Sequence, residues 1–141
     1  MQYHVTDDEI TKLVREKCAD DTEITTTAGL FYDADDPDGA YTVMGAFSES
    51  NTPAYRAYLA GFGLVVDHEN NMMTFTDNKD VLDVMRHIAH LVHLEYDNID
   101  DVPQLMWKLF DLGGDDDVDY FGGYINAVAD AIELWIDAHP A

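Results

Sequence analysis

The sequence predicts an α+β fold in which an antiparallel sheet of about four strands, arranged as two hairpins, is covered by about five helices. Three observations lead to this prediction. Five segments have the apolar spacing or the capping residues of helices, two pairs of strand-like segments flank turn-forming residues, and no segment has the composition of a linker. The predicted order is αββαββααα, and residues 1–141 are expected to form a single acidic domain.

The chain is expected to open with a helix followed by a hairpin. Thr6 and the glutamate three residues later have the spacing of a capping box, which predicts a helix to about Cys18, with the Cys18 thiol packed inside. A Thr-rich segment over 23–33 and an apolar segment over 40–47 flank a Asp-Pro-Asp-Gly turn signal at 36–39. These two segments are therefore expected to pair as strands.

The middle of the chain repeats the same kind of pattern. Thr52 is suited to cap a second helix, because a proline follows it at the first helical position and the pattern stops near Gly61. Two apolar segments over 64–66 and 72–76 lie on either side of a short polar sequence. They are expected to form the second hairpin.

Three helices are predicted in the last third of the chain. The first should be capped by Asp77 and end near Tyr96, the second should cover about 101–112, and the third should cover 117–138. The third helix has the clearest apolar stripe, with a 3-4-3-4-3 spacing. Its expected inward residues are Val118, Phe121, Ile125, Val128, Ile132 and Trp135.

The strongest feature of the composition is its charge. The chain has 29 Asp and Glu residues against seven Lys and Arg, a formal net charge of −22 at pH 7. Direct binding to nucleic acid or to an anionic membrane is therefore not expected, because both are polyanions. The sequence shows no signal peptide and no apolar run of membrane-spanning length, which favours a cytoplasmic location, and it leaves the oligomeric state open.

The acidic residues gather in stretches without Lys or Arg. There is none between Cys18 and Tyr55 and none after Lys108. One helix carries too few carboxylates to match the charge density of a duplex, so several clusters would have to share a face. The candidate partner-binding residues are Asp33, Asp35, Asp36, Asp38, Asp115, Asp116, Asp117, Asp119, Asp130, Glu133 and Asp137.

A weak candidate for a metal site lies on the predicted helix after Asp77. At 100° per residue, Asp83, His87 and His90 fall within about 60° of one another on its polar side. A carboxylate and two imidazoles are suitable ligands for a divalent metal, but their spacing matches no established metal motif. We therefore expect neither a metal nor another cofactor.

Enzyme signatures are absent from the sequence. It has no phosphate-cradling glycine loop, no nucleophile elbow and no HExxH motif. The turn at 36–39 lacks the acidic twelfth position and the flanking helices of a calcium-binding EF-hand. These observations favour a protein that is not an enzyme.

The charge and size favour an inhibitor or decoy that presents carboxylates where a partner expects phosphates. The expected partner is a protein with a basic, nucleic-acid-binding surface, such as a nuclease or CRISPR effector, and proteins of this kind serve phages or mobile elements as anti-CRISPR or anti-restriction factors. Two alternatives stay open. One is an acidic chaperone or adaptor that binds a cognate polypeptide, and the other is an ordinary protein of a salt-adapted cytoplasm.

Overall fold

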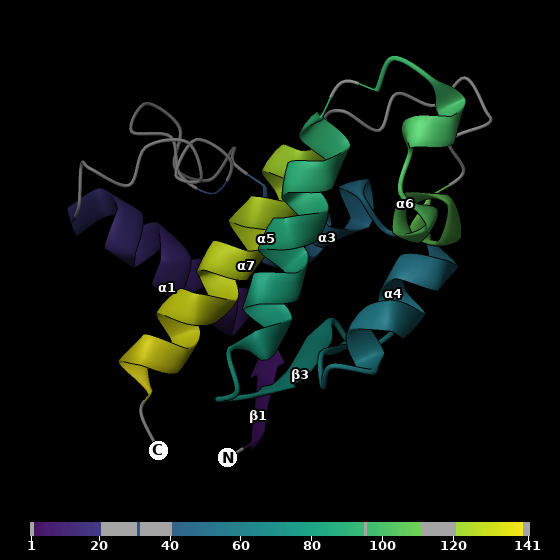
Figure 1. Cartoon of the computed structure of the whole chain (residues 1–141). Helices are drawn as coiled ribbons and strands as arrows, with labels where there is room; N and C mark the ends of the chain where they lie inside the picture. Colours follow the sequence, from purple (N-terminus) through teal and green to yellow (C-terminus); the bar gives the residue numbers. More distant parts are fainter. Residues whose placement is uncertain (1, 21–30, 32–40, 95, 111–120, 140–141) are drawn as a thin grey trace.

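A computed structural model of the chain describes residues 2–20, 31, 41–94, 96–110 and 121–139. Within these ranges the protein has an α+β fold, with a small antiparallel sheet at one end of a group of packed helices (Figure 1). In chain order the described elements are β1 (Gln2–Thr6), α1 (Asp7–Asp20), α3 (Val43–Glu49), α4 (Pro53–Ala60), β2 (Val65–Asp67), β3 (Met72–Thr76), α5 (Asp80–His93), the 3-10 helix η1 (Ile99–Asp101), α6 (Gln104–Leu109) and α7 (Phe121–Ala138). The predicted fold class is confirmed, whereas the predicted order αββαββααα is wrong.

The sheet differs from the prediction in the number and origin of its strands. Among the described residues it has three strands in the order β1-β3-β2, and both pairings are antiparallel. The hairpin of β2 and β3 is confirmed, but its neighbour β1 precedes the first helix and was not predicted. In β1, Tyr3 and Val5 are buried and lie opposite Phe75 and Met73. Their alternation with polar residues is the pattern of a half-buried strand.

The predicted strand over 40–47 is wrong, because most of this segment is helical. Helix α3 starts after Thr42, whose side chain accepts a hydrogen bond from the backbone N–H of Gly45. Its buried residues are Val43, Met44, Ala46 and Phe47, which have the spacing of one helical face. Of the predicted strand over 23–33, only Phe31 is described, and it is helical and fully buried. In the part of the two segments that the structure describes, the first predicted hairpin is therefore replaced by helix.

The other helices are confirmed, with shifted ends. The Thr6 hydroxyl accepts from the N–H of Glu9 at the start of α1, and the Thr52 hydroxyl accepts from the N–H of Tyr55 at the start of α4. The predicted cap at Asp77 is wrong: helix α5 begins at Asp80, after Lys79, whose side chain makes no capping hydrogen bond, and it ends at His93. Helix α6 ends at Leu109, earlier than predicted, and the predicted residues 117–120 of the last helix lie outside the described residues.

Helix α7 occupies the centre of the helical layer, where it packs against α1, α3 and α5 (Figure 1). Of the predicted stripe, Ile125, Val128 and Ile132 are buried, Phe121 and Trp135 are half-buried, and Val118 lies outside the described residues. Small residues are buried on α7 as well, and they let neighbouring helices approach on several sides. Cys18 is buried, as predicted.

A pair of glycines near the start of α7 gives a test of the contact between α5 and α7. A Cβ atom on Gly122 would lie 2.1 Å from Nε2 of His93, whereas a Cβ on Gly123 would meet nothing within 4 Å. We expect Gly123→Ala to stabilise the protein by about 0.5 kcal/mol, because alanine favours the helix more than glycine does. Gly122→Ala should gain less or destabilise, because the His93 ring must move.

Urea unfolding of the two variants measures this difference. The double variant Gly122→Ala with His93→Ala is the control, since it removes the ring that the new methyl group meets. It should be more stable than expected from adding the two single effects. Equal gains from Gly122→Ala and Gly123→Ala would contradict the close packing of His93 on α7.

Candidate functional site

The three predicted partner-binding residues on α7 lie beside two basic residues, one within α5 and one just before it. Arg86 Nη2 lies 2.6 Å from Asp130 Oδ1, and Arg86 Nη1 lies 3.5 Å from Glu133 Oε2. Lys79 Nζ lies 2.8 Å from Asp137 Oδ1, and this hydrogen bond raises the pKa of Lys79. The structure thus brings the three carboxylates together, and it adds two cations that the sequence pattern did not place beside them.

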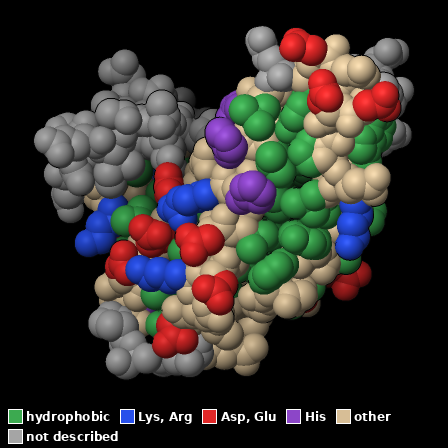
Figure 2. Space-filling model, viewed as in Figure 1, with side chains coloured by type: hydrophobic (Ala, Val, Ile, Leu, Met, Phe, Trp, Pro, Cys, Tyr) green, Lys and Arg blue, Asp and Glu red, His purple; other side chains and the backbone are tan. Residues whose placement is uncertain are grey.

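These ion pairs change what the α7 carboxylates can offer to a partner. The side chains of Asp130, Glu133 and Asp137 are still 37%, 40% and 57% exposed. A partner's cation can reach them, but it competes with Arg86 and Lys79 for the same oxygens. Figure 2 shows acidic and basic side chains intermixed on the side of the molecule formed by α1 and α7. We call Asp130, Glu133 and Asp137 the α7 stripe. It is a mixed-charge surface, and its role in partner binding stays a prediction.

The remaining predicted partner-binding residues cannot be placed relative to this stripe. Asp33, Asp35, Asp36 and Asp38 lie outside the described residues, as do the four of the second cluster, which are Asp115, Asp116, Asp117 and Asp119. Their role also stays a prediction. Besides the α7 stripe, two other described surfaces are candidates for partner binding: the carboxylates between α5 and α6, and an apolar pocket between α4 and α6.

A second group of carboxylates lies between α5 and α6. We call Asp97, Asp100 and Asp101 the acidic connection. All three are exposed, and none of their carboxylates makes an ion pair with another residue in the described part of the chain. The backbone here is held by Asn98, whose side-chain oxygen accepts from the N–H of Asp100 and whose carbonyl accepts from the N–H of Asp101.

Sequence reasoning missed the acidic connection, although the sequence carries the signal. No Lys or Arg occurs between Arg86 and Lys108. The absence of Lys and Arg also defines the other two acidic regions, which lie between Cys18 and Tyr55 and after Lys108. The acidic connection is thus a third stretch of this kind, and its carboxylates are less balanced by nearby cations than those of the α7 stripe.

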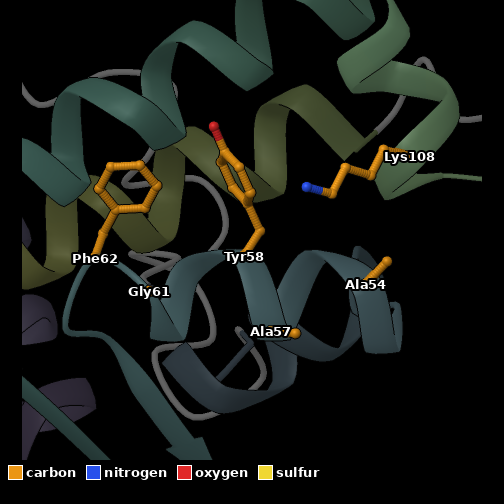
Figure 3. A pocket seen from close by; sticks show the side chains of 6 residues that line it. All are labelled: Ala54, Ala57, Tyr58, Gly61, Phe62 and Lys108. Atoms are coloured by element: carbon orange, nitrogen blue, oxygen red, sulfur yellow. The ribbon is translucent and has the colours of Figure 1, made fainter.

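The third surface is an apolar pocket between α4 and α6, which we call the α4 groove. It has a volume of about 420 Å³ and is lined by Ala54, Ala57, Tyr58, Gly61, Phe62 and Lys108. The rings of Tyr58 and Phe62 lie 5.2 Å apart, and Lys108 Nζ lies 5.6 Å from the centroid of the Tyr58 ring. In Figure 3 the Tyr58 ring rises from α4, the Phe62 ring comes from the turn that follows α4, and Lys108 reaches toward Tyr58 from α6.

The α4 groove belongs to a larger apolar area. Figure 2 shows hydrophobic side chains gathered between α5 and the pair formed by α4 and α6, with acidic side chains at the upper end of this area. Among the large apolar residues that the structure describes, Phe62 is 39% exposed and Leu94 is 41% exposed. An exposed apolar area with a charged border is typical of a surface that binds another protein.

The metal candidate receives no support from the geometry. Asp83, His87 and His90 are exposed on α5. Within the described residues, no group of three or more His, Cys, Asp or Glu side chains is placed so that it can hold a metal ion.

Comparisons with known proteins give no further guidance. No protein-family model, no curated protein and no solved structure matches the chain. Among the described helices, none combines the length and the apolar character needed to cross a membrane.

Proposed function

We propose that this protein is a non-enzymatic inhibitor that binds the basic, nucleic-acid-binding surface of another protein and occupies it as a decoy. The observation that carries the proposal is the net charge of −22, together with the exposed carboxylates of the acidic connection. A partner with the required surface is a nuclease or a CRISPR effector. The biological role would then be anti-CRISPR or anti-restriction activity on behalf of a phage or mobile element.

The physical basis is the replacement of phosphates by carboxylates. A nucleic-acid-binding groove presents Lys and Arg to a backbone that carries one charge per ~1.7 Å of duplex axis. Asp97, Asp100 and Asp101 offer three charges within five residues, and a rigid protein loses little freedom when such groups bind. Complementary charge of this kind raises the association rate and selects the correct partner.

A competition experiment tests the proposal. A fluorescently labelled DNA duplex is bound to a basic nuclease or CRISPR effector, and the acidic protein is then added. We expect it to displace the duplex, and to lose this ability steeply between roughly 0.05 and 0.2 M salt, because the interaction depends on many charges. Polyglutamate of similar net charge is the control, and it should compete more weakly because its carboxylates are not fixed in space.

Two outcomes would contradict the proposal. If the protein binds the partner while the duplex stays bound, it does not occupy the nucleic-acid site. If circular dichroism shows that the chain folds only in molar salt, the interpretation as a protein of a salt-adapted cytoplasm is correct instead.

A second candidate function is favoured by the α4 groove. An acidic chaperone or adaptor would bind a cognate polypeptide through this apolar surface, and such binding would tolerate added salt. The salt dependence of partner binding therefore separates the two functions.

A further inference from the structure

We infer that the α4 groove and the acidic connection together form one docking site for a short, basic, amphipathic segment of the partner polypeptide. An apolar side chain of that segment enters the groove beside Tyr58 and Phe62, and its Lys or Arg residues contact the acidic connection. This inference rests on the proposed function, because it specifies where a basic partner is anchored.

The groove has the properties of an anchor site. Its walls include two aromatic rings in contact with each other and the small residues Ala54, Ala57 and Gly61, which leave room above the helix. Aromatic side chains that are partly exposed in a pocket contribute strongly to protein interfaces. The volume of about 420 Å³ can accept one or two large apolar side chains.

Lys108 is the movable part of the groove. Its ammonium group lies over the Tyr58 ring, an attraction between a cation and the ring face that is weak at an exposed site. Lys108 is exposed, so the end of its side chain can swing into solvent when an apolar side chain enters. Its aliphatic part then stays as one wall of the site.

The acidic connection lies close enough to act together with the groove. Lys108 lies within α6 (Gln104–Leu109), and Asp101 lies three residues before its first residue. Three extended residues span at most about 11 Å and four helical residues about 6 Å, so the backbones of Asp101 and Lys108 are at most about 17 Å apart. A helical segment of about 14 residues spans roughly 21 Å. One such segment therefore reaches both the aromatic rings and the carboxylates.

Charge decides which occupant fits this surface. A second copy of the chain also carries a net charge of −22, so repulsion opposes self-association through this face. A basic segment is attracted to the upper end of this face, where acidic side chains border the apolar area, while Lys or Arg side chains lie at its right-hand side (Figure 2). An amphipathic helix in a groove is an established mode of polypeptide recognition.

The test uses two synthetic peptides of about 14 residues, long enough for about four helical turns. One contains Lys with Leu on a single helical face, and the other has Ala at every Leu position and the same charge. Fluorescence anisotropy measures their binding to the intact protein. We expect the Leu peptide to bind at least about tenfold more tightly than the Ala peptide, since only Leu fills the groove.

Two matched variants locate the site. Ala57 lines the groove and Ala60 does not, although both are exposed on α4. Ala57→Glu should weaken binding of the Leu peptide about tenfold by placing a charged side chain in the groove, whereas Ala60→Glu adds the same charge and should leave binding unchanged. A triple variant of the acidic connection should weaken binding of the Leu peptide and make that binding less dependent on salt. It combines Asp97→Asn, Asp100→Asn and Asp101→Asn.

Equal behaviour of Ala57→Glu and Ala60→Glu, or equal binding of the Leu and Ala peptides, would overturn the docking site. If groove variants have no effect but duplex displacement still occurs, this inference fails and the decoy function stands. If the groove variants behave as expected but the duplex does not compete, the decoy function fails and the chaperone or adaptor function is favoured.

Discussion

Neutralising the acidic connection should weaken association with a basic, nucleic-acid-binding partner by about tenfold or more at low salt. The variant combines Asp97→Asn, Asp100→Asn and Asp101→Asn. The loss should come mostly from a slower association rate, because long-range steering depends on the summed charge of the surface. A single substitution should cost little, since an exposed pair contributes only about 0–1 kcal/mol. Stopped-flow association at two salt concentrations measures the effect.

The α7 stripe provides the matched control for this triple variant. Asp130→Asn, Glu133→Gln and Asp137→Asn together remove the same number of charges, but in the folded protein these carboxylates already contact Arg86 and Lys79. We therefore expect a smaller loss of affinity and a small loss of stability. A larger loss from the α7 variant than from the acidic connection would mean that the partner displaces these ion pairs.

The two acidic clusters outside the described residues complete the series. One variant converts Asp33, Asp35 and Asp36 to Asn, and the other converts Asp115, Asp116 and Asp117 to Asn. Circular dichroism establishes that each variant is folded before its affinity is measured. If all four triple variants bind normally, phosphate mimicry is not the basis of partner binding.

Two of the predicted helix caps are confirmed, whereas the predicted cap at Asp77 is wrong, because Lys79 precedes α5 and makes no side-chain capping hydrogen bond. Thr6 and Thr52 were predicted as helix caps, and both side chains accept the expected backbone hydrogen bond. Such a cap is formed by residues three positions apart, so the sequence contains the whole interaction. The β2–β3 hairpin was also predicted correctly, because its strands and turn are close in sequence.

The segment at 40–47 was misinterpreted because its local preference and its tertiary environment disagree. Tyr41, Thr42 and Val43 favour a strand. In the folded protein, however, the first two N–H groups of α3 donate to the side chains of Thr11 and Asp7 on α1. A helix start stabilised by residues more than 30 positions away cannot be recognised from the segment itself.

The candidate site was predictable only where charge alone defines it. The acidic connection follows from the absence of Lys and Arg between Arg86 and Lys108. The pairing of Arg86 with Asp130 can be predicted only if α5 and α7 are known to be neighbours. The α4 groove can be predicted only if α4 and α6 are known to be neighbours. These adjacencies are long-range properties that helical periodicity does not contain.

The junction of α1 and α3 is held by the side chains of Thr11 and Asp7, and its loss should cost much of the protein's stability. Thr11 is 3% exposed, and its hydroxyl accepts from the N–H of Val43 at 2.9 Å while donating to Asp7 Oδ1 at 3.1 Å. The same Asp7 oxygen accepts from the N–H of Met44 at 3.0 Å. A single carboxylate and a single hydroxyl thus satisfy two backbone donors at the start of α3, which would otherwise lack partners.

Thr11→Val should destabilise the protein by about 1–3 kcal/mol, because it leaves the buried N–H of Val43 unpaired while preserving the shape of the side chain. Thr11→Ser is the control, since it keeps the hydroxyl and removes one methyl group, at a cost of about 0.8 kcal/mol. Urea unfolding measures both variants. If Thr11→Val were as stable as Thr11→Ser, the hydrogen bond to Val43 would not hold α3 against α1, and the helical state of the segment after Thr42 would need another cause.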